Sequence, residues 1–262
     1  MSNIISNSAL DRRRFFKGAV IATAGLTGAA LLFSASAAEA AIPSAIPGTG
    51  DLQVLNYALA LEDLEADLYL QASLRLGAGG TDPQAASTVG AIVGLNVSGL
   101  DVTYINLFRP VEAAHRDFLK SALGAQAITT LKPAKYDFGI QNMTRQQVLD
   151  LVLEAEATGV QAYLGAIPCF TPKSPYLQTA AAIQGTEARH TSVLTVVRNL
   201  LSVQGIVTDP ISPVAPLKGD NAQPTATNYD NAMPSKGTVE GRDAFLSPDQ
   251  VLARVGGFIK YS

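Results

Sequence analysis

The residues most able to carry out chemistry are the two histidines of the chain, and each lies three residues after a glutamate. They form the segments Glu112-Ala-Ala-His115 and Glu187-Ala-Arg-His190. Only eight of the 262 residues are glutamate, so chance rarely produces this repeated spacing. Residues three apart on an α-helix lie on one face. A carboxylate and an imidazole held side by side are typical ligands of iron, manganese or zinc.

Both pairs lie on the apolar faces of predicted helices. Residues 176–203 repeat apolar side chains with helical spacing, and Glu187 and His190 stand on the same stripe as Ile183 and Leu194. Burying an unpaired charge costs several kcal/mol. A bound metal ion is the simplest compensation, and hydrogen-bonded polar pairs without metal are the alternative.

Two further helices each place one glutamate among apolar residues. The first is predicted over 52–74, with Asp51 as its cap and Glu62 on the apolar stripe. The other begins at a capping box on Thr144 and runs to about Ala166, with Glu156 on the stripe. The chain thus predicts four long helices that each direct a carboxylate into the core.

Neighbouring polar residues are weaker candidates for the same site. Glu65 lies one turn further along the first helix and rivals its neighbour, while Glu154 in the third helix is off the stripe. Tyr69 and Tyr163 each follow a stripe glutamate by seven residues. They could hydrogen-bond the opposite ligands as a second layer around the metals, or be ordinary core tyrosines.

The remaining boundaries follow from turn residues. The second helix is predicted over 100–123, with Pro110 kinking or restarting it. Ser174-Pro175 is expected to cap and begin the fourth helix. We assign 84–99 to a crossover connection and 124–143 to a loop. The first and third helices each carry a stripe glutamate followed seven residues later by a tyrosine, and the second and fourth each carry a Glu-x-x-His pair. This repeat predicts two helical hairpins related by an approximate two-fold axis.

The inward set contains one glutamate from each of two helices and a Glu-x-x-His pair from each of the other two: Glu62, Glu112, His115, Glu156, Glu187 and His190. This is the ligand pattern of carboxylate-bridged di-iron and di-manganese bundles. Four glutamates also balance the charge of two divalent cations.

The chain resembles the ferritin-like superfamily, and more narrowly the bacterial and plant proteins related to desiccation-related proteins. The resemblance covers about residues 50–203 and implies an all-α, ferritin-like up-down four-helix bundle with a crossover connection. It also implies that Glu62, Glu112 and His115 bind one metal ion. Glu156, Glu187 and His190 would then bind the other, with Glu112 and Glu187 as bridges.

The N-terminal forty residues are predicted to be an export signal rather than part of the fold. Arg12-Arg13-Arg14-Phe15-Phe16-Lys17 resembles a twin-arginine motif, and an uncharged stretch leads to a small-residue cleavage site near Ala40-Ala41. The alternative is a retained membrane anchor. Cleavage would deliver the protein to the periplasm or the medium through the twin-arginine translocase, with no stable membrane span.

The rest of the chain adds little chemistry. Residues 41–50 are predicted to be a linker, 51–204 the bundle, and 205–262 a Pro-rich, mostly irregular extension that ends in a short helix near 248–261. The net charge of −3 and the lack of basic runs argue against nucleic-acid binding. The single Cys169 excludes an internal disulfide. The oligomeric state, including a homo-oligomer, stays open.

These observations support three hypotheses. The first is an exported metalloprotein with two iron or manganese ions, zinc being a third candidate, that oxidises Fe(II) with dioxygen or consumes peroxide in stress protection. The second is a non-catalytic envelope protein in which metals only stabilise the bundle. The third is an enzyme similar to manganese catalase. No residue can be assigned a catalytic role from the sequence.

Overall fold

A computed structural model describes residues 41–77, 91–95, 97–128, 135–206, 238–239, 242–243 and 246–260. The predicted export signal lies outside these residues. So do half of the predicted crossover segment and most of the Pro-rich stretch. Within the described residues, no helix is both long enough and apolar enough to cross a membrane.

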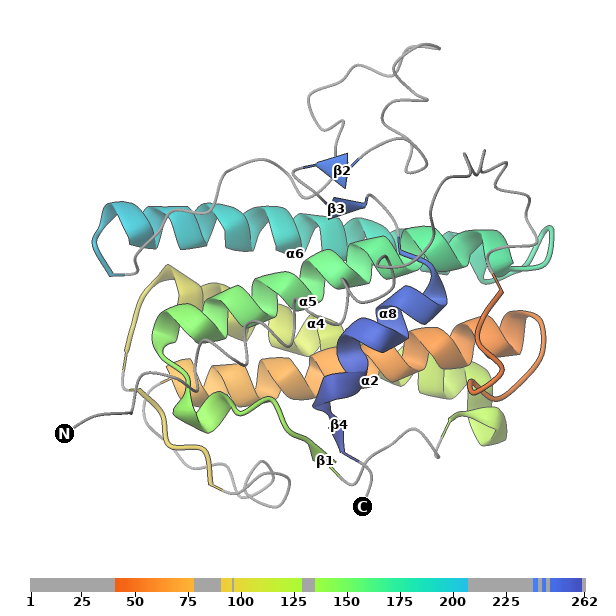
Figure 1. The fold of residues 1–262 in the computed structure, drawn as a ribbon, viewed down its shortest axis with the longest axis horizontal. Coiled ribbons are helices and arrows are strands. Elements are labelled where there is room, and N and C mark those ends of the chain that lie inside the picture. The colour runs from red at the N-terminus through yellow and green to blue at the C-terminus, as the bar shows by residue number, and fades with distance from the viewer. Residues whose placement is uncertain are drawn as a thin grey trace, which may run out of the picture.

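Four long helices dominate the described part of the chain and confirm the prediction of an all-α bundle (Figure 1). Their bounds lie within two residues of those expected from apolar periodicity. They are α2 (Asp51–Leu76), α4 (Leu100–Leu123), α5 (Arg145–Ala166) and α6 (Leu177–Val203). The capping box at Thr144 is also present, with the Gln147 backbone N–H donating to the threonine hydroxyl.

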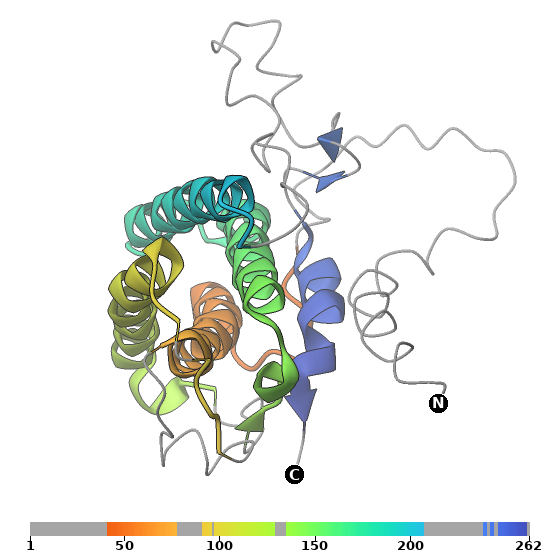
Figure 2. The ribbon, with the colours of Figure 1, turned by 90° about the vertical axis from the view of Figure 1, so that its left-hand side faces the viewer.

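The helices form two antiparallel hairpins that face each other. Lys120 Nζ of α4 lies 2.9 Å from Asp63 Oδ1 of α2. In the other hairpin, Arg198 Nε of α6 lies 2.7 Å from Asp150 Oδ1 of α5. Seen end-on, α2 lies next to both α4 and α5, whereas α4 and α5 are diagonal partners around a common centre (Figure 2). Each of the four helices directs its apolar stripe of side chains toward the interior of this arrangement.

The crossover connection is not where the sequence placed it. α2 and α4 are antiparallel neighbours, so the segment around 84–99 joins the two helices of one hairpin. The parallel pair is α4 and α5, and residues 124–144 must therefore run the length of the bundle (Figure 1). Chain direction depends on which helices pack together, and periodicity within a helix does not reveal it.

Short elements line the crossover and the C-terminus. The crossover contains η1 (Gly124–Gln126), β1 (Lys135–Tyr136) and η2 (Ile140–Asn142). After α5 comes η3 (Ile167–Cys169). The C-terminal part contains a two-residue hairpin of β2 (Thr238–Val239) and β3 (Arg242–Asp243), then α8 (Pro248–Val255), η5 (Gly256–Phe258) and β4 (Ile259–Lys260).

The C-terminal helix α8 packs outside the bundle against α5 (Figure 2). A capping box on Ser247 begins it, and Val251 and Val255 are buried against the bundle. β4 pairs antiparallel with β1, with Tyr136 opposite Ile259. The predicted terminal helix therefore exists but ends at Val255, because two glycines follow and the chain turns into a strand.

Two local predictions at helix ends differ from the structure, and at Pro110 one of the two predicted alternatives, a restart of the helix, does not occur. Gly50 occupies the cap position of α2, and Asp51 instead accepts hydrogen bonds from the backbone N–H and the hydroxyl group of Thr171. Ser174 precedes α6 by a turn, so Tyr176 is the cap residue. α4 runs through Pro110 without a restart. Both Pro110 and Asn106, whose carbonyl loses its helical partner, are exposed, so water can satisfy that carbonyl.

The segment predicted to be a linker is packed against the bundle. Ile42 and Ile46 are buried, and the side-chain amide of Gln53 in α2 donates to the Ile46 carbonyl oxygen (3.0 Å). Asn56 likewise donates to the Pro47 carbonyl oxygen (3.0 Å). Residues 41–50 therefore form the first packed segment of the described fold.

Candidate metal centre

The six predicted ligands converge at mid-length of the bundle, each from the stripe expected for it. α2 supplies Glu62, α4 supplies Glu112 and His115, α5 supplies Glu156, and α6 supplies Glu187 and His190. All four glutamates are fully buried, and His190 is 1% exposed. His115 is the most accessible, with 13% of its side chain exposed. Helical spacing places each Glu-x-x-His pair on one face, and the antiparallel hairpins bring the two faces together.

The imidazole of His115 faces three carboxyl groups through one nitrogen atom. Nδ1 lies 3.0 Å from Glu112 Oε2, 3.3 Å from Glu62 Oε2 and 3.5 Å from Glu187 Oε1. A ring nitrogen has one proton or one lone pair and cannot satisfy three carboxylates by hydrogen bonding. Carboxylate oxygens from three helices around one imidazole nitrogen are instead suited to bind a shared cation at their centre.

His190 repeats this arrangement on the other side of the centre. Its Nδ1 atom lies 2.7 Å from Glu112 Oε1 and 3.2 Å from Glu156 Oε1. The ring stacks on Phe108 of α4, with centroids 3.8 Å apart and planes 16° from parallel. Phe108 therefore fixes the orientation of the imidazole. Its helical spacing from Glu112 and His115 places it on their apolar face, but nothing in the sequence links it to a histidine of another helix.

The donor atoms form two groups that share Glu112. One group contains Glu62, Glu112, His115 and Glu187; the other contains Glu112, Glu156 and His190, and within each group the donor atoms lie within 4.8 Å of one another. The two oxygen atoms of Glu112 face different histidines, as a bridging carboxylate would require. Glu187 was predicted as a second bridge and falls in the group of His115, but not also in the group of its helical neighbour His190. That all six residues bind metal stays a prediction.

Two tyrosines hold carboxylates across the pseudo-two-fold axis. The Tyr163 hydroxyl of α5 donates to Glu62 Oε1 of α2 (2.6 Å), and the Tyr69 hydroxyl of α2 donates to Glu156 Oε1 of α5. Each tyrosine thus contacts the glutamate of the opposite hairpin. The hydrogen bond to Glu62 leaves its Oε2 atom to face His115, whereas Glu156 Oε1 contacts both Tyr69 and His190. Both tyrosines thereby fix the orientation of a predicted ligand.

Without metal, the centre is electrostatically strained. Burial, and then repulsion from neighbouring carboxylates, raises the pKa of Glu156 and Glu187 well above the ordinary value. Burial also raises the pKa of Glu62. Burial alone would raise the pKa of Glu112 too, but its hydrogen bonds to His115 and His190 lower it. Bound cations would place positive charge among these carboxylates and so remove the repulsion between them.

Buried oxygen atoms without partners show that the donor set fits metal ions. Within the described residues, Glu156 Oε2 and Glu187 Oε2 are buried without a hydrogen-bond partner, and Glu62 Oε2, Glu112 Oε1 and Glu187 Oε1 each face only a histidine nitrogen that other carboxyl groups share. Unsatisfied buried carboxylates are costly, and hydrogen-bonded polar pairs would not leave so many of them. The set of carboxylate oxygens and imidazole nitrogens suits iron, manganese or zinc.

A glycine in α5 makes room for the centre. A Cβ atom on Gly159 would lie 2.6 Å from Glu187 Oε2 and 3.3 Å from Glu65 Oε1. Glu65 is itself buried beside the centre, although it belongs to neither ligand group. Gly159 was not among the predicted site residues. The sequence signal was a glycine inside a strong helical pattern, three residues after the predicted ligand Glu156. A glycine in such a place commonly allows another group to pack close to the helix backbone.

Comparison with known proteins agrees with this geometry. The family described as Ferritin-like domain matches residues 50–201, which hold all six predicted ligands. No curated protein and no solved structure matches the chain. Because the family match spans more than half of the chain, the protein belongs to the ferritin-like domain family.

Proposed function

We propose that the protein binds two metal ions, iron or manganese, at the centre between the two hairpins, and uses them to oxidise Fe(II) or to consume peroxide. The observation that carries this proposal is the division of the donor atoms into two histidine-containing groups that share Glu112. Zinc fits the same donors but would not support redox chemistry.

A bound pair of redox-active metals would supply electrons to dioxygen or peroxide. The residues of the chain set the conditions for this chemistry. Carboxylates dominate the donor set, which favours the higher oxidation state. Tyr69 and Tyr163 fix the outer glutamates, and Phe108 fixes the His190 ring. Near-complete burial keeps bulk water away, and the partial exposure of His115 marks the most open side.

A competing function is purely structural, with the metals joining the two hairpins of an envelope protein. Elemental analysis and redox assays of the reconstituted protein separate the two functions. Our proposal predicts two ions per chain and turnover with Fe(II) plus dioxygen or with hydrogen peroxide. Absence of turnover, combined with a lower melting temperature after metal removal, would support the structural function.

The identity of the metal decides between the two redox reactions. Manganese in protein purified from its native source, with release of dioxygen from hydrogen peroxide, would indicate a catalase-like enzyme. Iron, with faster Fe(II) oxidation than in buffer, would indicate a ferroxidase. Either activity fits stress protection of the kind suggested by the resemblance to desiccation-related proteins.

We further propose that the protein acts outside the cytoplasm. The twin-arginine motif at Arg12-Arg13 and the small-residue site near Ala40 support export of the folded, metal-loaded chain by the twin-arginine translocase. Cell fractionation with N-terminal sequencing tests this. Mature protein beginning near Ala41 outside the cytoplasm is expected, and uncleaved cytoplasmic protein would contradict it.

A further inference from the structure

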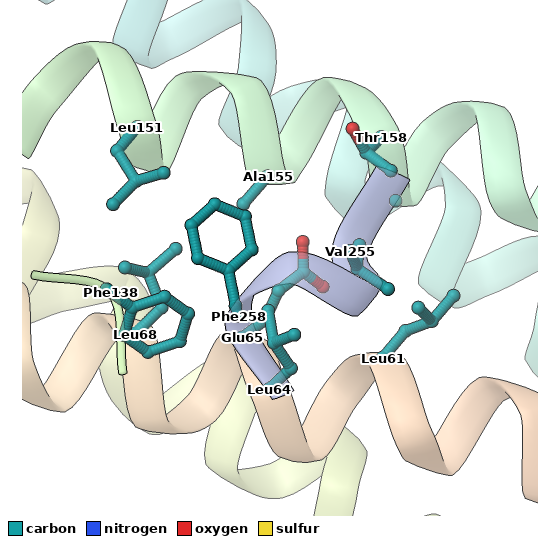
Figure 3. A pocket seen from close by; sticks show the side chains of 11 residues that line it. Leu61, Leu64, Glu65, Leu68, Phe138, Leu151, Ala155, Thr158, Val255 and Phe258 are labelled. Atoms are coloured by element: carbon teal, nitrogen blue, oxygen red, sulfur yellow. The ribbon is translucent and has the colours of Figure 1, made fainter. Parts of the chain in front are cut away.

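A small cavity lies beside the metal centre, between α2 and α5 (Figure 3). Its volume of about 20 Å³ is sufficient for a molecule of the size of water. Helices α2 and α5 form its sides. Phe138 of the crossover, and Val255 and Phe258 of the C-terminal segment, complete the wall. The C-terminal segment therefore lines the cavity on the side away from the bundle axis.

Glu65 is the ionisable side chain in a wall made mainly of apolar groups. Figure 3 shows its carboxyl group among leucine, valine and phenylalanine side chains. Glu65 is 4% exposed, and its Oε2 atom has no hydrogen-bond partner among the described residues. The other polar residue in the wall is Thr158, whose hydroxyl group already donates to the Glu154 carbonyl (2.7 Å) and accepts from Arg254 Nη1 (3.2 Å). Glu65 thus presents a buried carboxyl oxygen that lacks a hydrogen-bond partner.

The cavity and the metal centre meet at Gly159. This residue lines the cavity, and the position that a Cβ atom would take there is close to oxygens of both Glu65 and Glu187. Glu187 is one of the predicted ligands. Glu65 therefore lies close to both the cavity and the donor atoms, and Gly159 places no side chain between them.

We propose that this cavity admits hydrogen peroxide to the metal centre and that Glu65 receives the molecule through hydrogen bonds. The inference rests on the proposed function and names the substrate of the same site. Peroxide has two heavy atoms, each carrying an O–H donor. One donor can bond to Glu65 while the other faces the ligand carboxylates. Dioxygen has no donor to offer, and the cavity is too small for an organic substrate.

Binding can be tested separately from turnover by soaking crystals in hydrogen peroxide. Zinc-loaded crystals are suitable because zinc does not consume peroxide, and metal-free crystals test the cavity alone. We expect density for a two-atom molecule within hydrogen-bond distance of Glu65. The density should disappear in Ala155→Leu, which fills the cavity, and remain in Ala114→Leu, an alanine replaced on the exposed face of α4. An empty cavity in wild-type crystals would overturn the proposal.

Kinetics of the metal-loaded protein provide the second test. We expect Glu65→Leu and Ala155→Leu to slow single-turnover oxidation of the metals by hydrogen peroxide by about tenfold or more, with unchanged metal content. Glu65→Gln keeps an acceptor oxygen and should stay close to wild type. Oxidation by dioxygen should be insensitive to Glu65→Leu. The proposed peroxide route would be refuted if Glu65→Leu slowed oxidation by hydrogen peroxide and by dioxygen equally. It would also be refuted if Ala155→Leu did not slow oxidation by hydrogen peroxide.

The two tests also separate this inference from the proposed function. If the protein binds no metal, the proposed function is wrong. The soaked metal-free crystals would still show whether Glu65 binds peroxide. A redox-active protein with an empty cavity would keep the function and reject the route.

Discussion

At the scale of single residues, Glu112 has a position that no other ligand shares. One of its oxygens lies 3.0 Å from His115 and the other 2.7 Å from His190. Its fully buried side chain belongs to both donor groups. In the proposed centre, loss of this carboxylate should therefore affect both metal positions, whereas loss of a predicted terminal ligand such as Glu156 should affect one.

We predict that Glu112→Gln lowers the metal content of the reconstituted protein at both positions, to well below one ion per chain. Glu156→Gln should lower it mainly at the position of His190. The matched control is Glu154→Gln, which replaces a glutamate on the same helix that lies 3.6 Å from Arg254 and outside both donor groups. Elemental analysis after gel filtration measures all three. A Glu112→Gln protein with full metal content would contradict the bridging role.

Gly159 offers a second test, because a methyl group there would lie 2.6 Å from Glu187 Oε2. We predict that Gly159→Ala displaces Glu187 and weakens metal affinity by about tenfold or more, measured by competition with a chelator. Gly185→Ala on α6 is the control, since nothing lies within 4 Å of its new Cβ. That variant should bind metal normally and gain up to about 1 kcal/mol of helix stability. Equal metal affinity in the two variants would show that the close contact between position 159 and Glu187 does not matter for metal binding.

Residue types and spacing predicted much of the site. The Glu-x-x-His pairs, the stripe positions of Glu62 and Glu156, and the two tyrosines all follow from helical periodicity, and the structure brings them together. Glu187 was expected to bridge both groups, and its placement in the His115 group alone could not be predicted, because it depends on how far a side chain reaches across the bundle. The contact between Phe108 and His190 depends on helix packing in the same way.

At the scale of elements, periodicity placed the four long helices within two residues but could not orient them. The direction of each helix follows from its partners, so the crossover was assigned to 84–99 instead of 124–144. Helix ends were least predictable where a tertiary contact competes with a local cap. Asp51 bonds to Thr171, which is 120 residues away in the chain, instead of capping α2.

The attachment of the C-terminal segment to α5 can be tested at Gly165. A Cβ atom there would lie 2.0 Å from the Leu246 carbonyl oxygen, so Gly165→Ala must push this segment away. We predict a loss of about 1–3 kcal/mol in the free energy of unfolding, measured by chemical denaturation of metal-free protein. Gly256→Ala, which meets nothing within 4 Å, should be close to neutral. Similar stability of the two variants would show that α8 is not held at this point.

At the scale of the whole molecule, the centre couples stability to pH and metal. Carboxyl groups with a raised pKa, such as Glu156 and Glu187, keep their protons in the folded state to a higher pH than in the unfolded chain. Hydrogen bonds to three glutamates also raise the pKa of His115 to about 12, although burial alone would lower it. The folded state thus binds more protons above the ordinary glutamate value of 4.5, and stability falls as pH rises. The lowered pKa of Glu112 acts in the opposite direction, but only below that value.

We therefore predict that the melting temperature of the metal-free protein decreases between about pH 5 and pH 8. Metal binding needs deprotonated ligands, so the loaded protein should gain affinity over the same range. The difference in melting temperature between loaded and metal-free protein should then widen with pH, as calorimetry can measure. A difference that stays constant or narrows would mean that the buried carboxylates are not the metal ligands.

The most direct test is a crystal structure of the reconstituted protein with an anomalous-difference map at the absorption edge of the bound metal. The account predicts two peaks at mid-length of the bundle, on either side of Glu112, one in contact with His115 Nδ1 and the other with His190 Nδ1. A single peak, peaks elsewhere in the molecule, or no peak at full reconstitution would contradict it.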